Sequence, residues 1–337
     1  MTMIKILATE EMKEIAQGAY QQLRLQDSSF SYADVDVITF TSKEFKPKIT
    51  ETIRHHEVYL FHSLYHPDPN SAFIKLFLTI DAISRASAKS ITLVLPYMSY
   101  LRQDRKDESR VPISARLMAN LIEVNRKVER IIVMDMHSDQ AQGFYNLPLD
   151  NLYGALIHKE FFKKKYKSNF TNLIVVSPDH GGAIRTRRFA KYLDPEMSIG
   201  IVDKRRSGSR SNKVEILNYL GPEIKGKDII LYDDMIDTGG SIIAAATMLL
   251  GKGARKVYAC ATHGLFSAPS EKITAEEQLR AAGISVVVTN SIPRTKEYSK
   301  KNQDWLTILS VENLLANAIY ESSKVGGSIS TLFGATK

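Results

Sequence analysis

The chain has 337 residues, 44% of them hydrophobic and 24% charged, a composition typical of a globular protein long enough for two domains. No apolar run approaches the roughly 18 residues of a membrane-spanning helix, and the N-terminus lacks the layout of a signal peptide. The single Cys260 excludes an internal disulfide and fits a reducing compartment. We therefore expect a cytoplasmic protein with no membrane partner. The net charge of +8 suits nucleic acid or small polyphosphates.

Short strands and helices alternate along the sequence. In the first half we predict strands at 4–8, 57–62, 91–95 and 131–134, and helices at 10–23, 71–88 and 113–124. In the second half we predict strands at 173–176, 197–202, 228–232, 257–262 and 284–289, with a helix at 242–250. This alternation predicts an α/β fold of mostly parallel sheets flanked by helices, with ligands at the carboxyl ends of the strands.

The segment from Tyr232 to Ser241 is the most informative motif, because it joins a predicted strand to a predicted helix. Its Thr238-Gly239-Gly240-Ser241 turn lets backbone N–H groups converge on an anion at a helix N-terminus, which predicts a phosphate cradle. Three carboxylates, Asp233, Asp234 and Asp237, precede the turn and suit hydroxyls or a metal-bound group. A sugar phosphate has both a phosphate for the turn and hydroxyls for the carboxylates.

Two further motifs carry charged groups at predicted strand ends. Arg102-Gln103-Asp104-Arg105-Lys106 follows one strand, and a flat guanidinium there can stack on adenine while its neighbours reach phosphates. The sequence contains no P-loop, so ATP would need such an alternative site. His137 follows another strand, and together with Asp179 it could hold a divalent ion beside phosphate oxygens.

Five motifs occur in order along essentially the whole chain, at 96–106, 135–145, 176–182, 203–206 and 232–241. Together they resemble the ribose-phosphate diphosphokinase family, also called phosphoribosyl pyrophosphate synthetases. The resemblance implies two similar phosphoribosyltransferase-type domains. We expect an N-terminal domain at 1–150, joined by the C-terminal segment 312–337, and a second domain at 151–311.

The resemblance also implies a reaction, in which the anomeric hydroxyl of ribose 5-phosphate takes the diphosphoryl group of magnesium ATP and AMP leaves. His137 and Asp179 would be the metal ligands, with manganese as a substitute for magnesium, and Asp179, Gly181 and Gly182 would cradle pyrophosphate. Lys204 and Arg206, on a mobile loop after a strand, would stabilise the transferring group. Arg206 would also contact ribose 5-phosphate, together with the loop of Asp233, Asp234, Asp237 and Thr238 to Ser241.

The nucleotide site would be formed by Arg102, Gln103, Asp104, Arg105 and His137. Its other wall would be the segment of Phe40, Ser42, Lys43 and Glu44 from a neighbouring subunit of a homo-oligomer, by resemblance a hexamer built from dimers. Family members usually have Phe-Ser-Asp-Gly-Glu at this segment, so Ser42 and Lys43 replace an acid and a glycine. We therefore expect an altered preference for the nucleotide base.

Three alternatives stay open on the sequence alone. The chain could be a catalytically weak regulatory subunit, but such relatives typically lose the metal-binding histidine or the loop lysine, and this chain has both. A nucleic-acid-binding module rests only on the basic charge, so we expect no nucleic-acid partner. A phosphoribosyltransferase that consumes the diphosphate would explain Asp233 to Ser241, but not Arg102 to Lys106 or His137.

Overall fold

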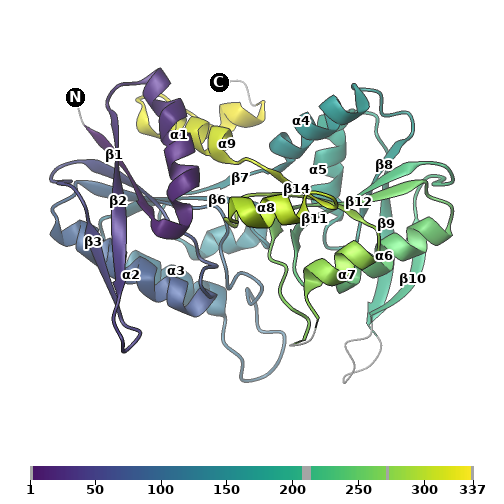
Figure 1. The fold of residues 1–337 in the computed structure, drawn as a ribbon, viewed down its shortest axis with the longest axis horizontal. Coiled ribbons are helices and arrows are strands. Elements are labelled where there is room, and N and C mark those ends of the chain that lie inside the picture. Colours follow the sequence, from purple (N-terminus) through teal and green to yellow (C-terminus); the bar gives the residue numbers. More distant parts are fainter. Residues whose placement is uncertain (1–2, 207–213, 271–272, 335–337) are drawn as a thin grey trace. The chain divides into compact units, whose positions relative to one another are not determined.

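The computed structural model describes residues 3–206, 214–270 and 273–334, and for 204–206 and 214–217 it describes the backbone alone. The chain forms two compact units, Met1–Tyr153 with Val311–Lys337, and Gly154–Ser310 (Figure 1). In the described part of the chain, no helix is both long and apolar enough to cross a membrane. Each unit contains one seven-stranded sheet.

The sheet of the first unit has the strand order β3-β2-β1-β4-β5-β6-β7. Only the β2–β3 hairpin is antiparallel, and the other neighbours pair in parallel. The strands are β1 (Ile4–Thr9), β2 (Phe30–Thr39), β3 (Phe45–Ile49), β4 (Glu57–Phe61), β5 (Ser90–Leu95), β6 (Val128–Met134) and β7 (Leu149–Leu152).

Helices cover both faces of this sheet, as parallel strands require (Figure 1). One face carries α1 (Lys13–Gln26) and α9 (Glu312–Ser323), which pack on each other. The other carries α2 (Pro69–Arg85) and α3 (Ser114–Glu123), whose apolar sides join the core beneath. Short 3₁₀ turns complete the unit: η1 (Glu10–Met12), η2 (Asp139–Phe144) and η3 (Ile329–Phe333).

The sheet of the second unit has the strand order β10-β9-β8-β11-β12-β13-β14, and only the β9–β10 pair is antiparallel. Its strands are β8 (Leu173–Ser177), β9 (Ile199–Arg206), β10 (Val214–Leu220), β11 (Asp228–Ile236), β12 (Lys256–Gly264), β13 (Ser285–Thr289) and β14 (Leu306–Leu309). The order places β11 at the centre, between β8 and β12.

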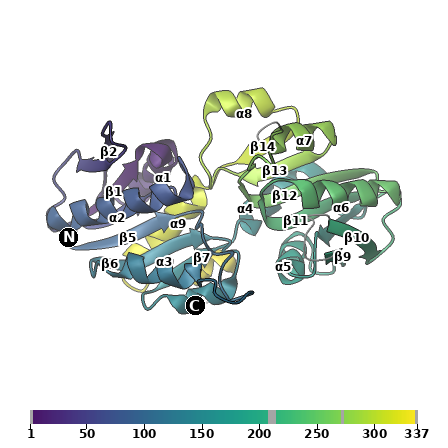
Figure 2. The ribbon, with the colours of Figure 1, turned by 90° about the horizontal axis from the view of Figure 1, so that it is seen from below.

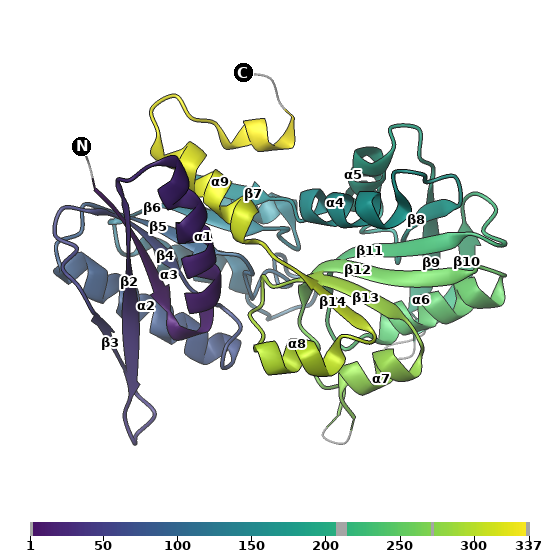
Figure 3. The same cartoon turned by 45° about the horizontal axis from the view of Figure 1, so that its top comes forward.

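Two pairs of helices enclose this second sheet (Figures 2 and 3). One face carries α4 (Ala155–Tyr166) and α5 (Ala183–Leu193), and the other carries α6 (Gly240–Gly251) and α7 (Ala275–Ala281). The short α8 (Lys296–Asn302) precedes β14. The expected fold of two mostly parallel sheets flanked by helices is confirmed.

The two predicted strand ends that differ most from the structure, by four residues each, lie at site motifs. We predicted that β9 ends at Val202, but it continues to Arg206 by antiparallel pairing with β10, so the four residues from Asp203 form a strand rather than a loop. We predicted that β11 ends at Tyr232, but it continues to Ile236 along β12. In both cases backbone pairing with a neighbouring strand outweighs the polar local sequence.

The aromatic packing under β11 provides a test of what holds the second unit together. Phe189 of α5 stacks on Tyr232 of β11 with ring centroids 4.1 Å apart, and both side chains are fully buried. We expect Phe189→Ala to lower the free energy of unfolding by about 3–5 kcal/mol, and Phe189→Leu by less, because leucine fills part of the cavity. Chemical denaturation measures both. A loss below about 1 kcal/mol for Phe189→Ala would contradict this packing role.

Candidate functional site

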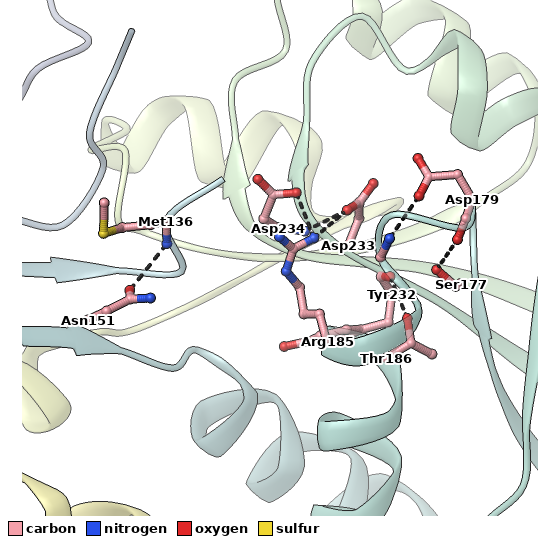
Figure 4. Close-up of polar contacts among 10 residues, drawn as sticks. Met136, Asn151, Ser177, Asp179, Arg185, Thr186, Tyr232, Asp233 and Asp234 are labelled. Carbon is pink, nitrogen blue, oxygen red and sulfur yellow. Dashed lines mark hydrogen bonds and ion pairs between the residues drawn. The ribbon is translucent and has the colours of Figure 1, made fainter. Parts of the chain in front are cut away.

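Two carboxylates within the last four residues of β11 share one guanidinium. Arg185, in the first turns of α5, donates through Nη1 to Oδ1 of Asp233 and to Oδ1 of Asp234, at 2.9 Å each (Figure 4). The backbone N–H of Asp234 also donates to Oδ1 of Asp233 at 2.9 Å. The Asp234 side chain is 3% exposed and the Asp233 side chain 23% exposed. The two acids are therefore held close together at the carboxyl edge of the sheet.

This crowding affects the protonation of Asp233. Burial raises the pKa of the Asp233 carboxyl well above its ordinary value, and the neighbouring charge of Asp234 raises that pKa further. The Arg185 guanidinium opposes both effects and lowers the pKa of Asp233. Arg185 is therefore the group that favours the ionised, hydrogen-bond-accepting form of this carboxyl.

The strand that carries the acids is anchored by Tyr232. Besides stacking on Phe189, its hydroxyl lies 3.3 Å from Nδ1 of the buried His158, and its carbonyl accepts a hydrogen bond from Thr186 Oγ1. Burial lowers the pKa of His158 to about 3, so the ring is neutral at physiological pH. Tyr232 thus fixes the backbone immediately before Asp233.

The loop after β8 closes on itself through Asp179. Its Oδ1 accepts a hydrogen bond from the backbone N–H of Gly182 at 2.9 Å, and its carbonyl accepts one from Ser177 Oγ at 2.6 Å. A Cβ at position 182 would lie 2.8 Å from Ser177 Oγ, so the turn needs a glycine there. The same Cβ would lie 3.6 Å from Asp179 Oδ1 and 3.8 Å from Asp233 Oδ1, so these two carboxylates flank one glycine.

The turn from Asp237 to Ser241 leads from β11 into α6. Gly239 precedes the helix with φ of 80°, in the left-handed region that glycine adopts readily, and Gly240 is the first helical residue. Thr238, Gly240 and Ser241 are exposed, and a Cβ on Gly240 would meet nothing closer than 4.0 Å. The turn therefore exposes the N-terminus of α6, where an anion can approach backbone N–H groups.

Two site segments of the first unit follow neighbouring strands. The segment 102–106 comes after β5, with Arg102, Gln103 and Arg105 exposed. Gln103 Oε1 accepts a hydrogen bond from Ser114 Oγ at 2.5 Å, and its carbonyl accepts one from the N–H of Ala115, which ties this segment to α3. His137 comes after β6 and is also exposed. Since β5 and β6 are paired in parallel, both segments lie at the same edge of the sheet.

The segment 40–44 forms the tip of the β2–β3 hairpin. The N–H of Phe40 donates to the carbonyl of Glu44 and the N–H of Lys43 donates to the carbonyl of Phe40, both at 2.9 Å. Ser42 Oγ donates to Glu44 Oε2 at 2.6 Å. Lys43 has φ of 72°, so it occupies a left-handed turn position that glycine adopts without strain. Strands β1 and β4 separate β2 from β5, so these two strands lie about 14 Å apart across the sheet, and β2 continues to Thr39, four residues beyond its pairing with the end of β1.

Lys204 and Arg206 are the proposed charge-stabilising pair. Their backbone lies in β9, where Lys204 is opposite Ile216 and Arg206 is opposite Val214. Their side chains, and the segment 207–213, lie outside the part of the chain that the structure describes. At the base of this strand, Asp203 Oδ1 is 2.9 Å from Nε2 of His180, which links β9 to the Asp179 loop.

The second unit offers carboxylate oxygens, which are the type of ligand that magnesium prefers. Among the described residues, no group of three or more His, Cys, Asp or Glu side chains could by itself hold a metal ion. Magnesium prefers oxygen ligands and usually takes only one or two carboxylates, with water and substrate phosphates as the rest. The Asp179 carboxylate beside the phosphate-type turns is therefore a suitable donor for a magnesium ion that arrives with a phosphorylated substrate.

The two mostly parallel sheets, the second with a glycine turn and paired acids at its carboxyl edge, define an α/β protein of the phosphoribosyltransferase type. Models of the N-terminal domain of ribose phosphate pyrophosphokinase and of the phosphoribosyl synthetase-associated domain match residues 4–125 and 207–334. The ribose-phosphate pyrophosphokinase of Aquifex aeolicus is 40% identical over 98% of this chain and 99% of its own length.

Further relatives agree with that match. The ribose-phosphate pyrophosphokinase of Synechococcus elongatus is 43% identical over 87% of this chain and 84% of its own length. The crystal structure of phosphoribosylpyrophosphate synthetase from Mycobacterium smegmatis superposes with a TM-score of 0.79, at 33% identity, over 96% of this chain and all of that one. The chain therefore belongs to the ribose-phosphate pyrophosphokinase family, and by this membership it is an enzyme with ribose-phosphate pyrophosphokinase activity.

The sequence places Arg185 in a cluster with Arg187 and Arg188 that suits anionic substrates, but it does not predict the contact of Arg185 with the paired acids. The residue lies in the helix that follows the Asp179 loop, and nothing in its neighbourhood along the chain indicates that it contacts Asp233 and Asp234, 48 and 49 positions later. The contact of Arg185 with the acids could be predicted only from the topology of the sheet. A helix that follows one strand of a parallel sheet begins at the same edge where the next strand ends, so its first turns lie near that strand's terminal residues.

Two glycines at positive φ, Gly239 before α6 and Gly226 before β11, have different space for a side chain. Gly239→Ala would put a Cβ 3.2 Å from Leu279 Cγ at a positive φ, whereas Gly226→Ala meets nothing within 4 Å at a similar φ of 73°. We expect both to lose about 1–2 kcal/mol of stability to backbone strain, with a further loss in Gly239→Ala alone from the contact with Leu279. Thermal unfolding compares the two. Equal losses would show that Leu279 moves aside without cost.

Proposed function

We propose that the family activity is carried out in this chain by the residues described above. The anomeric hydroxyl oxygen of ribose 5-phosphate attacks the β-phosphorus of ATP, the bond from that phosphorus to the α,β-bridging oxygen breaks, and AMP leaves with the bridging oxygen. The products are phosphoribosyl diphosphate and AMP. The observation that supports this most is the pairing of the glycine turn with Asp233 and Asp234 at the end of one strand.

In the second unit, the proposed site binds the phosphate of ribose 5-phosphate with backbone N–H groups and its hydroxyls with carboxylates. Thr238 to Ser241 would bind the 5-phosphate through backbone N–H groups at the start of α6, with Asp237 ordering the turn. Asp233 and Asp234 would accept hydrogen bonds from ribose hydroxyls. Anionic carboxylates repel phosphate and accept well from hydroxyls, so this arrangement orients the sugar.

In the first unit, Arg102, Gln103, Asp104, Arg105 and His137 would bind ATP. The tip of the β2–β3 hairpin, from Phe40 to Glu44, would contact the adenine of a neighbouring subunit. The distance of about 14 Å across the sheet between β2 and β5, with β2 extended further along its own direction, supports a contribution from another chain, because the two segments lie far apart for one adenine ring.

A homo-oligomer, by family resemblance a hexamer built from dimers, is part of this proposal. The outer sides of α2 and α3 support it, since each helix exposes apolar residues four positions apart. These are Ile74 and Leu78 on α2, and Leu117 and Leu121 on α3. A four-residue spacing puts each pair on one side of its helix, which is typical of a contact surface.

Magnesium, with manganese as a substitute, is proposed as the cofactor. His137 and Asp179 would provide the protein ligands, and the ion would supply neutralisation of the phosphate charge. Around it, Asp179, Gly181 and Gly182 would hold pyrophosphate oxygens by backbone N–H groups, and Lys204 and Arg206 would stabilise the charge of the transferring group. The presence of His137 and Lys204 favours a catalytic chain over a regulatory subunit.

An assay of AMP formed from ATP tests the proposal when ribose 5-phosphate and magnesium are varied. We expect Lys204→Ala and Arg206→Ala each to lower kcat by about a hundredfold or more with smaller changes in KM, because contacts made mainly in the transition state act on kcat. AMP formation that is independent of ribose 5-phosphate would contradict the proposed reaction. Losses below tenfold in both variants would remove Lys204 and Arg206 from the mechanism.

The hairpin tip provides a second test, on the choice of base. Ser42 Oγ donates its proton to Glu44, so it is engaged within the turn where relatives have an acid. An acidic acceptor for the exocyclic amine of adenine is therefore missing. We expect Ser42→Asp with Lys43→Gly to raise the preference for ATP over GTP roughly five- to a hundredfold, since a lost buried partner costs about 1–3 kcal/mol.

The ratio of kcat/KM for the two nucleotides measures this preference. Lys43→Gly alone is the control, because it relaxes a residue at positive φ without adding an acceptor. If the double variant and the control give the same ratio as the parent chain, adenine is read elsewhere, by backbone groups or by Arg102 and Gln103.

A further inference from the structure

Arg185 occupies a specific place in the second unit. It follows the turn of Gly181 and Gly182, and its guanidinium reaches across to the end of β11. One nitrogen, Nη1, donates to both Asp233 and Asp234 at the same distance of 2.9 Å (Figure 4). Its side chain is 21% exposed, so these ion pairs are mostly shielded from water.

Adjacent carboxylates in such a place need a counter-charge. Asp233 and Asp234 are consecutive in the chain, and the Asp233 Oδ1 atom accepts hydrogen bonds from Arg185 Nη1 and from the backbone N–H of Asp234. Like charges repel strongly when water is largely excluded. Without a cation between them, the two side chains would turn apart or one would take up a proton.

We infer that Arg185 is a positioning residue for ribose 5-phosphate, which holds the carboxylates of Asp233 and Asp234 together so that they can accept hydrogen bonds from the ribose hydroxyls. The inference rests on the ribose-binding role proposed above for these two acids. Arg185 itself need not touch the sugar. It determines which carboxylate oxygens face the substrate, and it does so from the helix that also starts at the Asp179 loop.

The geometry separates this role from the binding of the 5-phosphate. The phosphate turn at Thr238 to Ser241 belongs to the β11–α6 connection, whereas Arg185 contacts the strand before it. Loss of the guanidinium should therefore weaken recognition of the hydroxyls and spare recognition of the phosphate. A general loosening of the fold would weaken both.

The test uses the full-length enzyme with Arg185→Met, Arg185→Lys and the control Arg187→Met, which lies on the same helix with an exposed side chain. Two ligands are compared: ribose 5-phosphate, and 2,3-dideoxyribose 5-phosphate, which keeps the phosphate and lacks two hydroxyls. We expect Arg185→Met to lower the affinity for ribose 5-phosphate by about thirtyfold or more, and to change the affinity for the dideoxy ligand by less than about threefold. Arg185→Lys should recover part of the loss, and Arg187→Met should match the parent.

A double-mutant cycle with Asp233→Asn checks that Arg185 acts through the carboxylates. If it does, Arg185→Met should cost roughly tenfold less affinity in the Asp233→Asn background than in the parent. Equal costs in both backgrounds, equal losses for both ligands, or an Arg185→Met that behaves like Arg187→Met would each overturn the inference. A parent enzyme that forms no AMP in response to ribose 5-phosphate would instead overturn the proposed function.

Discussion

The stack of Tyr232 on Phe189 is the constraint on which the candidate site depends. It joins the central strand of the second sheet to α5, and His158 and Thr186 hold the same tyrosine from two further positions. Tyr232 immediately precedes the paired acids, and Arg185 lies one turn before Phe189 on the same helix. The buried contact therefore fixes the positions of both the acids and the arginine that pairs with them. The geometry of the ion pairs near the strand end therefore depends on the packing of the core beneath them.

Parallel pairing explains why the remaining site residues gather where they do. Parallel neighbours need a crossover connection that returns the chain to the other edge of the sheet, so the residues after β5, β6, β8 and β11 all leave their sheets at the carboxyl edge. Within each unit, residues far apart in sequence are brought to one edge without any special local signal. The glycine turn at Gly239 then exposes the N-terminus of α6, where an anion can approach backbone N–H groups.

Much of this could be predicted from the sequence, because the apolar strands such as Ile91 to Leu95 and Leu173 to Val176 are short, β-branched and bounded by polar turns. The glycine turn before α6 was equally visible. The extensions of β9 to Arg206 and of β11 to Ile236 were not, since they depend on pairing with β10 and β12 rather than on local preference. The role of Arg185 and the left-handed backbone of Lys43 also depend on contacts that only the fold creates.

The central claim is that two phosphoryl groups move together from ATP to ribose 5-phosphate. The most direct measurement follows ATP labelled at the β-phosphorus through a reaction with ribose 5-phosphate and magnesium. The account predicts that all of the transferred label appears in phosphoribosyl diphosphate and that the nucleotide product is unlabelled AMP. Label retained in ADP, with only one phosphoryl group transferred to ribose 5-phosphate, would contradict the account.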